Sequence, residues 1–343
     1  MKKTIYTNNL RMFSLLLFLL VLTFPLSILA QNKTDGKKPQ IFHIQNYFSE
    51  AYLVKGNSEK LILIETGVSV PGYQDSLVNS IRKLGFKPEN ISLAIVTHGH
   101  GDHAGNARFL QQTFKIKIAG SKFDLDKFTS GKTELSKSED VSIWGTRLRP
   151  YTDLSYTPFT PDIIVENNTI DLEKYGVNGK IIPIKGGHTS GDLLILIGEN
   201  LFVGDAFLGT FKAQGGGLIP DGHHVREHFY HENKKLADEN LKVIEKIAIE
   251  NKIKTVYPTH NGPVTTYELT KYIKEEPLLR LLSKQESNLA AEDFRIVYAN
   301  ENTAVMTFLE TSKADGKDAK TASVTETYSK EKGIWKLVYK QVN

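Results

Sequence analysis

The chain has 343 residues, of which 40% are apolar and 24% charged, and these proportions are those of a globular protein rather than a disordered or fibrous one. This length accommodates one large domain and a small one. The absence of cysteine excludes disulfides and thiolate metal ligands. The formal net charge falls from +4 to +1 once the three basic residues of the first thirty are removed. Such a near-neutral chain gives no reason to expect a nucleic acid as partner.

The first thirty residues have the pattern of a secretory signal peptide. Three basic residues precede an uncharged run from Met12 to Ala30, and we expect cleavage after Ala30. The alternative is an uncleaved membrane anchor, because nineteen uncharged residues just suffice to span a bilayer. Pro25 interrupts a helix near the cleavage site and therefore favours cleavage. We predict a periplasmic or secreted protein without stable membrane insertion, in which residues 31–40 form a polar linker.

Apolar runs and turn residues predict the elements that follow the linker. A helix is expected from Tyr73 to Leu84, because its apolar residues share one face and Gly85 is a typical helix stop. Strands are expected at Ile41–Ile44, Tyr52–Val54, Leu61–Ile64 and Ser92–Val96, the second and third as a hairpin.

Three imidazoles and one carboxylate occur within six residues, directly after the last of these strands. They are His98, His100, Asp102 and His103. Imidazole nitrogen and carboxylate oxygen are the ligands that zinc prefers where thiolate is absent. Residues two apart in an extended segment point the same way, so His98 and His100 can hold one ion. Asp102 and His103 follow at the point where the chain should turn into a helix. They therefore face the site of a second ion beside the first. The alternative, a group of surface or helix-capping histidines, is disfavoured because four such residues with glycine spacers rarely coincide.

Two adjacent ions need further ligands, and three positions downstream qualify. His188, Asp205 and His260 each follow an apolar run, at Ile181–Ile184, Leu201–Val203 and Thr255–Tyr257. Loops at strand ends are where α/β sheets place their chemistry. Each position alone is more often a turn residue. Together with the first cluster they complete a set of five histidines and two aspartates.

These motifs resemble those of the metallo-β-lactamase superfamily. The matching segments are Glu65-Thr66-Gly67, the His98–His103 cluster, Gly187-His188-Thr189, Gly204-Asp205 and Pro258-Thr259-His260. The resemblance implies a four-layer αβ/βα sandwich over residues 41–277, an α/β arrangement with metals at one edge between the two sheets. It also implies two ions. The first would be held by His98, His100 and His188, the second by Asp102, His103 and His260, with Asp205 bridging them. Glu65 stands where the family usually has Asp, a residue that orients a metal-bound histidine, and the alternative is that Glu65 only caps a strand end.

The resemblance implies a zinc-dependent hydrolase with two Zn²⁺ per chain, with iron or manganese as alternative metals, and the signal peptide implies that it is exported. Two ions about 3.5–4 Å apart can share a hydroxide that attacks the substrate, and Asp102 can orient it and handle its proton. We expect cleavage of a small-molecule ester, lactone or thioester. A β-lactamase is the alternative that export favours, but such enzymes usually lack a bridging residue like Asp205. Further alternatives are an iron-dependent oxidoreductase of this fold and a non-catalytic, metal-stabilised binding module.

A second group of histidines lies between Asp205 and His260. His224, His228 and His231 have a spacing that would place them on one face of a helix starting near Asp221 and continuing to Asn251. We interpret His224 and His228 as candidate pocket or supporting residues, and a solvated helical turn is the alternative to metal binding. Residues 120–160 lack periodicity, and their Trp144, Tyr151, Tyr156 and Phe159 are candidate substrate contacts or packing residues.

Residues 278–343 form a small separate segment in the sequence. The end of a helical stretch is followed by four strand-like runs, Phe294–Ala299, Ala304–Leu309, Ala322–Tyr328 and Ile334–Val342. This pattern predicts a small α+β domain with an antiparallel meander. The segment contains no catalytic or metal-binding motif, and dimerisation is one role that it could have.

Overall fold

A computed structural model describes residues 38–46, 49–56, 58–139, 149–150, 152–209, 225, 228–283, 289–312 and 320–343. Lys38–Asn343 forms one compact unit. The predicted signal peptide and nearly all of the predicted linker lie outside the described residues, as do Trp144, Tyr151 and His224. Among the helices of the described part, none combines the length and apolar character needed to cross a membrane.

The first sheet has six strands in chain order. They are β1 (Gln40–Asn46), β2 (Ser49–Lys55), β3 (Leu61–Ile64), β4 (Ile91–Ile95), β5 (Ile118–Ser121) and β6 (Ile163–Val165). The β1–β2 and β2–β3 pairs are antiparallel, whereas β3 to β6 pair in parallel. The predicted hairpin is therefore confirmed as β2 and β3. All four residues of β3 are buried, as expected of a strand covered on both faces.

The second sheet also has six strands, in the order β12-β11-β10-β9-β8-β7. Their bounds are β7 (Ile170–Asp171), β8 (Gly179–Pro183), β9 (Leu193–Ile197), β10 (Asn200–Gly204), β11 (Thr255–Pro258) and β12 (Val264–Thr265). β10 and β11 are parallel, so their carboxyl ends lie at the same edge of this sheet.

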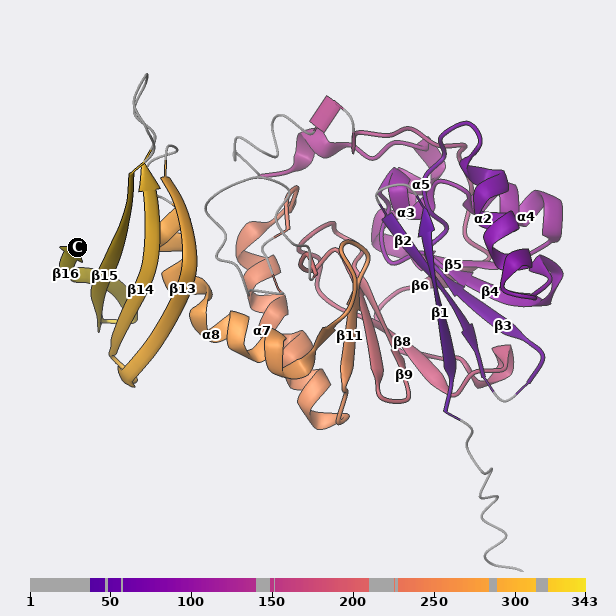
Figure 1. Ribbon diagram of the computed structural model, residues 1–343. Helices are drawn as coiled ribbons and strands as arrows, with labels where there is room; N and C mark the ends of the chain where they lie inside the picture. Colours follow the sequence, from indigo (N-terminus) through magenta and orange to yellow (C-terminus); the bar gives the residue numbers. More distant parts are fainter. Residues whose placement is uncertain are drawn as a thin grey trace, which may run out of the picture. The chain divides into compact units, whose positions relative to one another are not determined.

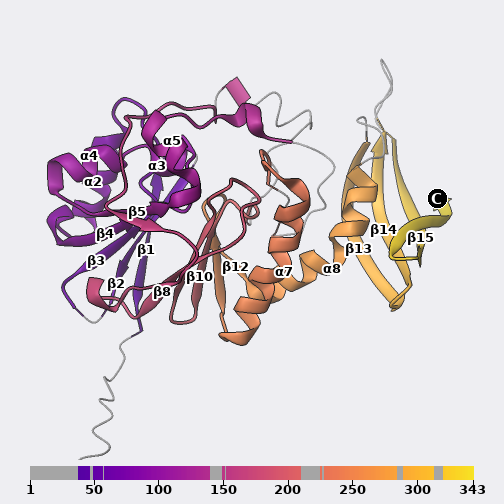
Figure 2. The ribbon, with the colours of Figure 1, turned by 180° about the vertical axis from the view of Figure 1, so that it is seen from behind.

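Helices cover the outer faces of both sheets (Figures 1 and 2). The first group is α2 (Tyr73–Lys83), α3 (Gly101–Ala104), α4 (Ala107–Phe114) and α5 (Leu125–Ser130). The second group is α7 (Lys234–Glu250) and α8 (Thr266–Ser283). Short 3-10 helices occur at Pro88–Asn90, Lys122–Asp124, Leu135–Lys137 and Glu173–Tyr175. The predicted helix is confirmed as α2, which buries Leu77, Val78 and Ile81 and ends before Gly85, whose φ of 84° suits glycine.

Three apolar cores bind these layers together. One joins α2 and α4 to the first sheet, with Leu77 and Leu110 among its members. The second fills the space between the sheets, with Ile64 and Ile195 among its members. The third joins the second sheet to α7 and α8. The order helix, sheet, sheet, helix is the predicted four-layer αβ/βα sandwich.

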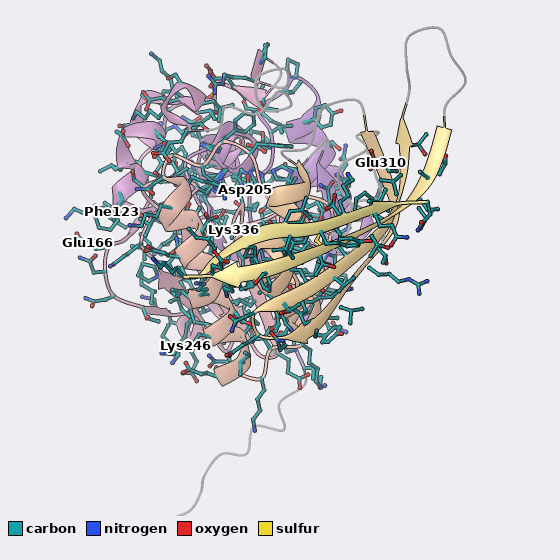
Figure 3. The ribbon with its side chains drawn as sticks, turned by 90° about the vertical axis from the view of Figure 1, so that its left-hand side faces the viewer. Phe123, Glu166, Asp205, Lys246, Glu310 and Lys336 are labelled. Carbon is teal, nitrogen blue, oxygen red and sulfur yellow. The ribbon has the colours of Figure 1, made fainter. Side chains whose placement is uncertain are left out.

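The C-terminal residues form a separate four-stranded antiparallel sheet, as predicted. Its strands are β13 (Leu289–Asn300), β14 (Thr303–Ser312), β15 (Lys320–Glu331) and β16 (Ile334–Val342), in that order. Figure 3 shows Glu310 and Lys336 on this sheet. Its core contains Met306, Phe308 and Trp335 together with Leu278 of α8. The predicted boundary after residue 277 thus falls inside α8.

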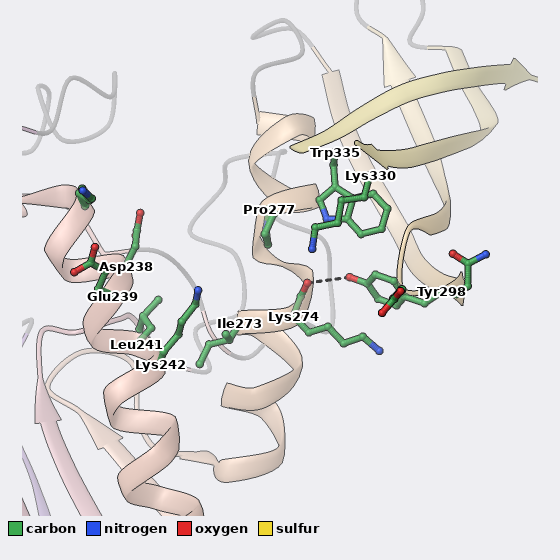
Figure 4. Close-up of a pocket in the computed structure, with 13 residues that line it drawn as sticks. Asp238, Glu239, Leu241, Lys242, Ile273, Lys274, Pro277, Tyr298, Lys330 and Trp335 are labelled. Atoms are coloured by element: carbon green, nitrogen blue, oxygen red, sulfur yellow. Dashed lines mark hydrogen bonds between the residues drawn. The ribbon is translucent and has the colours of Figure 1, made fainter. Parts of the chain in front are cut away.

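A pocket lies where α7, α8 and the ends of the C-terminal strands meet (Figure 4). Lysines, acidic residues and two aromatic side chains line it, and the Tyr298 hydroxyl donates a hydrogen bond of 3.0 Å to the Lys274 carbonyl. None of its lining residues is a histidine, so the predicted metal ligands belong to another part of the fold.

Candidate metal centre

The candidate ligands follow the ends of four strands in the two sheets. His98 comes three residues after β4, and His188 five residues after β8. Asp205 directly follows β10, and His260 comes two residues after β11. Buried strands fix where these short segments begin, so residues more than a hundred positions apart in sequence meet at one place.

The His98–His103 segment divides its donors between two positions, as the sequence predicts. His100 caps α3 with an extended backbone, φ −78° and ψ 152°. Asp102 and His103 lie in the first turn of α3 and are buried. The change from extended chain to helix turns the last two side chains away from the direction of the first two.

Seven donors gather in two sets that meet at Asp205. The first set is His98, His100, His188 and Asp205, and the second is Asp102, His103 and His260, with the donor atoms of each set within 4.8 Å of one another. The Oδ2 atom of Asp205 lies 3.4 Å from His188 Nε2 in its own set. The same oxygen lies 3.2 Å from His103 Nε2 and 3.3 Å from His260 Nε2 in the other. Donors bound to one ion at about 2.0–2.1 Å lie about 3–3.5 Å apart, so these spacings suit shared metal ligation.

Buried donor atoms in this cluster support a metal site. Among the residues that the structure describes, His98 Nε2, His103 Nε2 and Asp205 Oδ1 are buried without a hydrogen-bond partner. Leaving such atoms unsatisfied costs about 1–3 kcal/mol each, and native structures rarely tolerate it. A divalent cation would satisfy them, so the residues present fit a metal centre.

The electrostatics of the cluster favour a cation. Burial alone would raise the pKa of Asp102 and Asp205, yet the imidazoles around them hold both values well below the usual range. Burial lowers the pKa of His98 and His188 well below 6.5 and that of His100 to about 3, so these rings are neutral donors. His260 is mostly shielded from solvent, but the carboxylates raise its pKa to about 10. The carboxylates therefore attract positive charge, which metal ions would supply.

Comparison with known proteins identifies the family. The family model of the Metallo-beta-lactamase superfamily matches residues 45–260. The chain belongs to the metallo-β-lactamase superfamily. Members of this superfamily are mostly metal-dependent hydrolases, and the His/Asp cluster contains the residue types that could hold a metal ion. Among curated proteins, none matches the sequence significantly.

Solved structures of the superfamily are similar to this chain at low identity. BJP-1, a subclass B3 metallo-beta-lactamase of Bradyrhizobium japonicum, is 19% identical with a TM-score of 0.48, over 72% of this chain and 92% of that one. The FEZ-1 metallo-beta-lactamase from Legionella gormanii is 18% identical with a TM-score of 0.45, over 73% and 87%. The archaeal superfamily protein ST1585 from Sulfolobus tokodaii is 19% identical with a TM-score of 0.44, over 73% and 88%. At these identities the likeness says nothing about substrate.

Glu65, which departs from the superfamily pattern, lies behind the second donor set. Its Oε1 atom is 3.3 Å from His103 Nδ1 and accepts hydrogen bonds from the hydroxyls of Thr97, at 2.5 Å, and Thr259, at 3.2 Å. The side chain is fully buried, and its backbone has a φ of 64°, which is uncommon for a residue other than glycine. The carboxylate thus lies where it can orient His103, despite the extra methylene.

A buried charge network that the sequence analysis missed joins the two loops of the first donor set. Asp124 accepts a hydrogen bond of 2.7 Å from the Gly99 amide, between His98 and His100, and another of 2.7 Å from the Thr189 hydroxyl, next to His188. The Lys127 ammonium lies 3.2 Å from the Asp124 carboxylate and compensates its charge. Asp124 and Lys127 lie in the segment without periodicity, where only their i, i+3 spacing hints at a pair.

His228 and His231 of the second histidine group are not helical, so the helix predicted through these two residues is wrong. α7 begins only at Lys234, and its N-cap Asn233 accepts a hydrogen bond of 2.9 Å from the Leu236 amide. His228 and His231 precede it in irregular backbone and are buried. His231 Nδ1 lies 3.3 Å from His188 Nδ1, and His228 Nε2 lies 3.1 Å from Asp205 Oδ2. Tertiary contacts with the donor cluster fix these two side chains, rather than a helical face.

Tyr156 and Phe159, the two candidate contacts of the 120–160 segment that the structure describes, pack in the core. Tyr156 and Phe159 are buried with Phe128 against the first sheet. The Tyr156 hydroxyl donates a hydrogen bond of 2.9 Å to the Gly99 carbonyl. Of the two interpretations offered by the sequence, packing is therefore the one that fits these residues, and Tyr156 also supports the ligand loop.

Proposed function

We propose that this protein is a zinc-dependent hydrolase with two ions per chain, which cleaves a small-molecule ester, lactone or thioester after export to the periplasm or the medium. The observation that carries the proposal is Asp205. Its Oδ2 atom lies within 3.4 Å of His188 in one donor set and of both histidines in the other. A carboxylate in this position can serve two ions at once.

Metal ions held there would polarise the bond to be cleaved and lower the pKa of bound water from 15.7 toward about 7, which provides a nucleophile at neutral pH. The chain's own residues orient the reaction. Asp102 Oδ2 lies 3.2 Å from His260 Nε2, and these are the two most exposed side chains of the seven, at 10% and 12%. Among the seven donors this pair is therefore the most accessible to solvent, and the Asp102 carboxylate can accept a proton from bound water.

The zinc-loaded mature chain tests this proposal against four chromogenic substrates: an aryl ester, a lactone, a thioester and a cephalosporin. The His100→Ala variant is the control, because it removes a donor of the first set. We expect turnover of one of the first three substrates, lost by a factor of about 10³ or more in the variant. Efficient, His100-dependent cleavage of the cephalosporin would instead make the protein a β-lactamase. Equal turnover by both proteins on all four substrates would contradict the hydrolase proposal.

Metal analysis of the protein as purified addresses zinc itself. About two zinc ions per chain are expected, and a content dominated by iron would favour an oxidoreductase of this fold. Loss of bound metal without loss of the protein's biological activity would favour a binding module.

A further inference from the structure

His228 is an additional ligand-type side chain at the metal centre. Its Nε2 atom lies 3.1 Å from Asp205 Oδ2, closer than the nitrogen of any other histidine to that oxygen among the described residues. The His228 ring is buried, and its centroid lies 4.6 Å from that of His188 and 5.5 Å from that of His260. It therefore packs against both donor sets.

The hydrogen bonding of His228 presents one nitrogen to the cluster. Its Nδ1 atom contacts the carbonyl oxygen of Phe229, the next residue in the chain. A carbonyl oxygen only accepts, so Nδ1 carries the proton and donates it. In this tautomer Nε2 can offer its lone pair to a cation that it shares with Asp205. Metal-binding histidines usually hold one ring nitrogen on a carbonyl or carboxylate in this way, which fixes the tautomer and the ring orientation.

His228 also completes a third set of donors. Asp205, His228 and His260 bring their donor atoms within 4.8 Å of one another, as the two main sets do. This set shares His260 with the second position and Asp205 with both. We propose that His228 is a further ligand of the second metal position, beside His260 and the shared Asp205.

The additional ligand changes the chemistry that the second position supports. A donor beyond the usual set raises the coordination number of the ion it binds above the four of a typical structural zinc site. That ion should therefore have a higher coordination number in the wild-type protein than in a variant without His228. This inference rests on the proposed function only in requiring that the cluster binds metal.

Cobalt titration of the metal-free protein tests the role of His228. Co²⁺ is the probe because its visible spectrum responds to coordination number. His228→Phe keeps the aromatic bulk and removes the donor, and His228→Gln is a second variant of similar polarity. His43→Phe is the matched control, because His43 is a half-exposed histidine paired with Glu50 and belongs to none of the three donor sets.

The wild-type protein and His43→Phe should bind two Co²⁺ ions with the same affinities and spectra. In both His228 variants the affinity for one of the two ions should fall by at least about ten-fold, and the absorption of that ion should rise as its coordination number decreases. Paramagnetic NMR of the Co²⁺-loaded wild-type protein, labelled with ¹⁵N in its histidines, should show shifted imidazole N–H signals for six histidines. The signal of one of these histidines should be absent from the spectrum of His228→Gln.

The failures of the two proposals are distinguishable. If the wild-type protein binds two Co²⁺ ions and both His228 variants match it in affinity and spectrum, the His228 inference is wrong while the metal centre stands. If the wild-type protein binds no Co²⁺, or binds it equally well after His98→Ala, the metal centre and the inference both fail.

Discussion

Lys127 offers a direct test of the buried network behind the first donor set. Its ammonium lies 3.2 Å from Asp124 and 2.9 Å from Glu232, and only 1% of the residue is exposed. Asp124 is fully buried and holds both ligand loops through the Gly99 amide and the Thr189 hydroxyl. Lys127→Met fills the same space without the charge, so Asp124 loses its neighbouring cation.

Removing one partner of a buried ion pair costs about 3–5 kcal/mol, because the remaining charge stays buried without compensation. At roughly 2–4 °C per kcal/mol, the melting temperature should fall by roughly 6–20 °C at pH 8. Burial already raises the pKa of Asp124 in the intact protein, and the loss of Lys127 raises it further. A carboxyl group with a raised folded-state pKa destabilises the fold above that pKa, so the loss should shrink as the pH falls toward about 5.

Differential scanning calorimetry in excess zinc measures this effect, and Lys122→Met is the matched control. Lys122 makes an ion pair of 3.0 Å with Glu166, but both side chains are about half exposed, at 52% and 53%. Such a surface pair contributes about 0–1 kcal/mol. Equal losses in the two variants, or a loss in Lys127→Met that does not depend on pH, would refute the reasoning about buried charge.

Three further predictions concern the ligand support and the packing. Glu65→Gln removes the charge beside His103 and should weaken metal binding about 10–100-fold in competition with a chelator, and unchanged affinity would contradict the orienting role. The hydrogen bond and charge of Glu50 raise the pKa of His43 above 6.5, so an NMR titration should show a high midpoint that falls in Glu50→Gln. The ion pair of His43 and Glu50 stabilises the fold below pH 6.5, and this contribution is lost as the pH rises through the raised pKa of His43. Identical His43 midpoints in the wild-type protein and in Glu50→Gln would contradict this coupling. Gly105→Ala places a Cβ against three backbone atoms and should cost about 1–3 kcal/mol of unfolding free energy, whereas a neutral effect would show that the α3 region can shift.

The sequence predicts those parts of the fold whose signals are local. The helix that ends before Gly85 and the strands of the C-terminal sheet follow from apolar periodicity and turn residues, which act within a few positions of the chain. The donor cluster from His98 to His103 is equally local, because its spacing carries the geometry. The prediction of the remaining ligands needed the additional premise that strand ends converge at one edge of the fold. These ligands are His188, Asp205 and His260.

What the sequence did not predict depends on contacts between distant segments. The spacing of His228 and His231 suits a helix, yet Asn233 starts α7 later because its side chain caps the Leu236 amide. Asp124 has no sequence signal of its own, since its partners Gly99 and Thr189 lie 25 and 65 positions away. Such contacts form only after the strands have positioned the loops.

α8 belongs to two apolar cores at once. Leu269 and Tyr272 in its first part pack against the second sheet, whereas Leu278 packs in the core of the C-terminal sheet. Pro277, which lacks an amide hydrogen, lies next to the point of change. During synthesis on the ribosome the four layers can close before β13 to β16 have emerged, and Leu278 then gains its apolar contacts only when these strands have folded. A truncation after α8 would remove those contacts and leave this apolar side chain open to water, which favours aggregation.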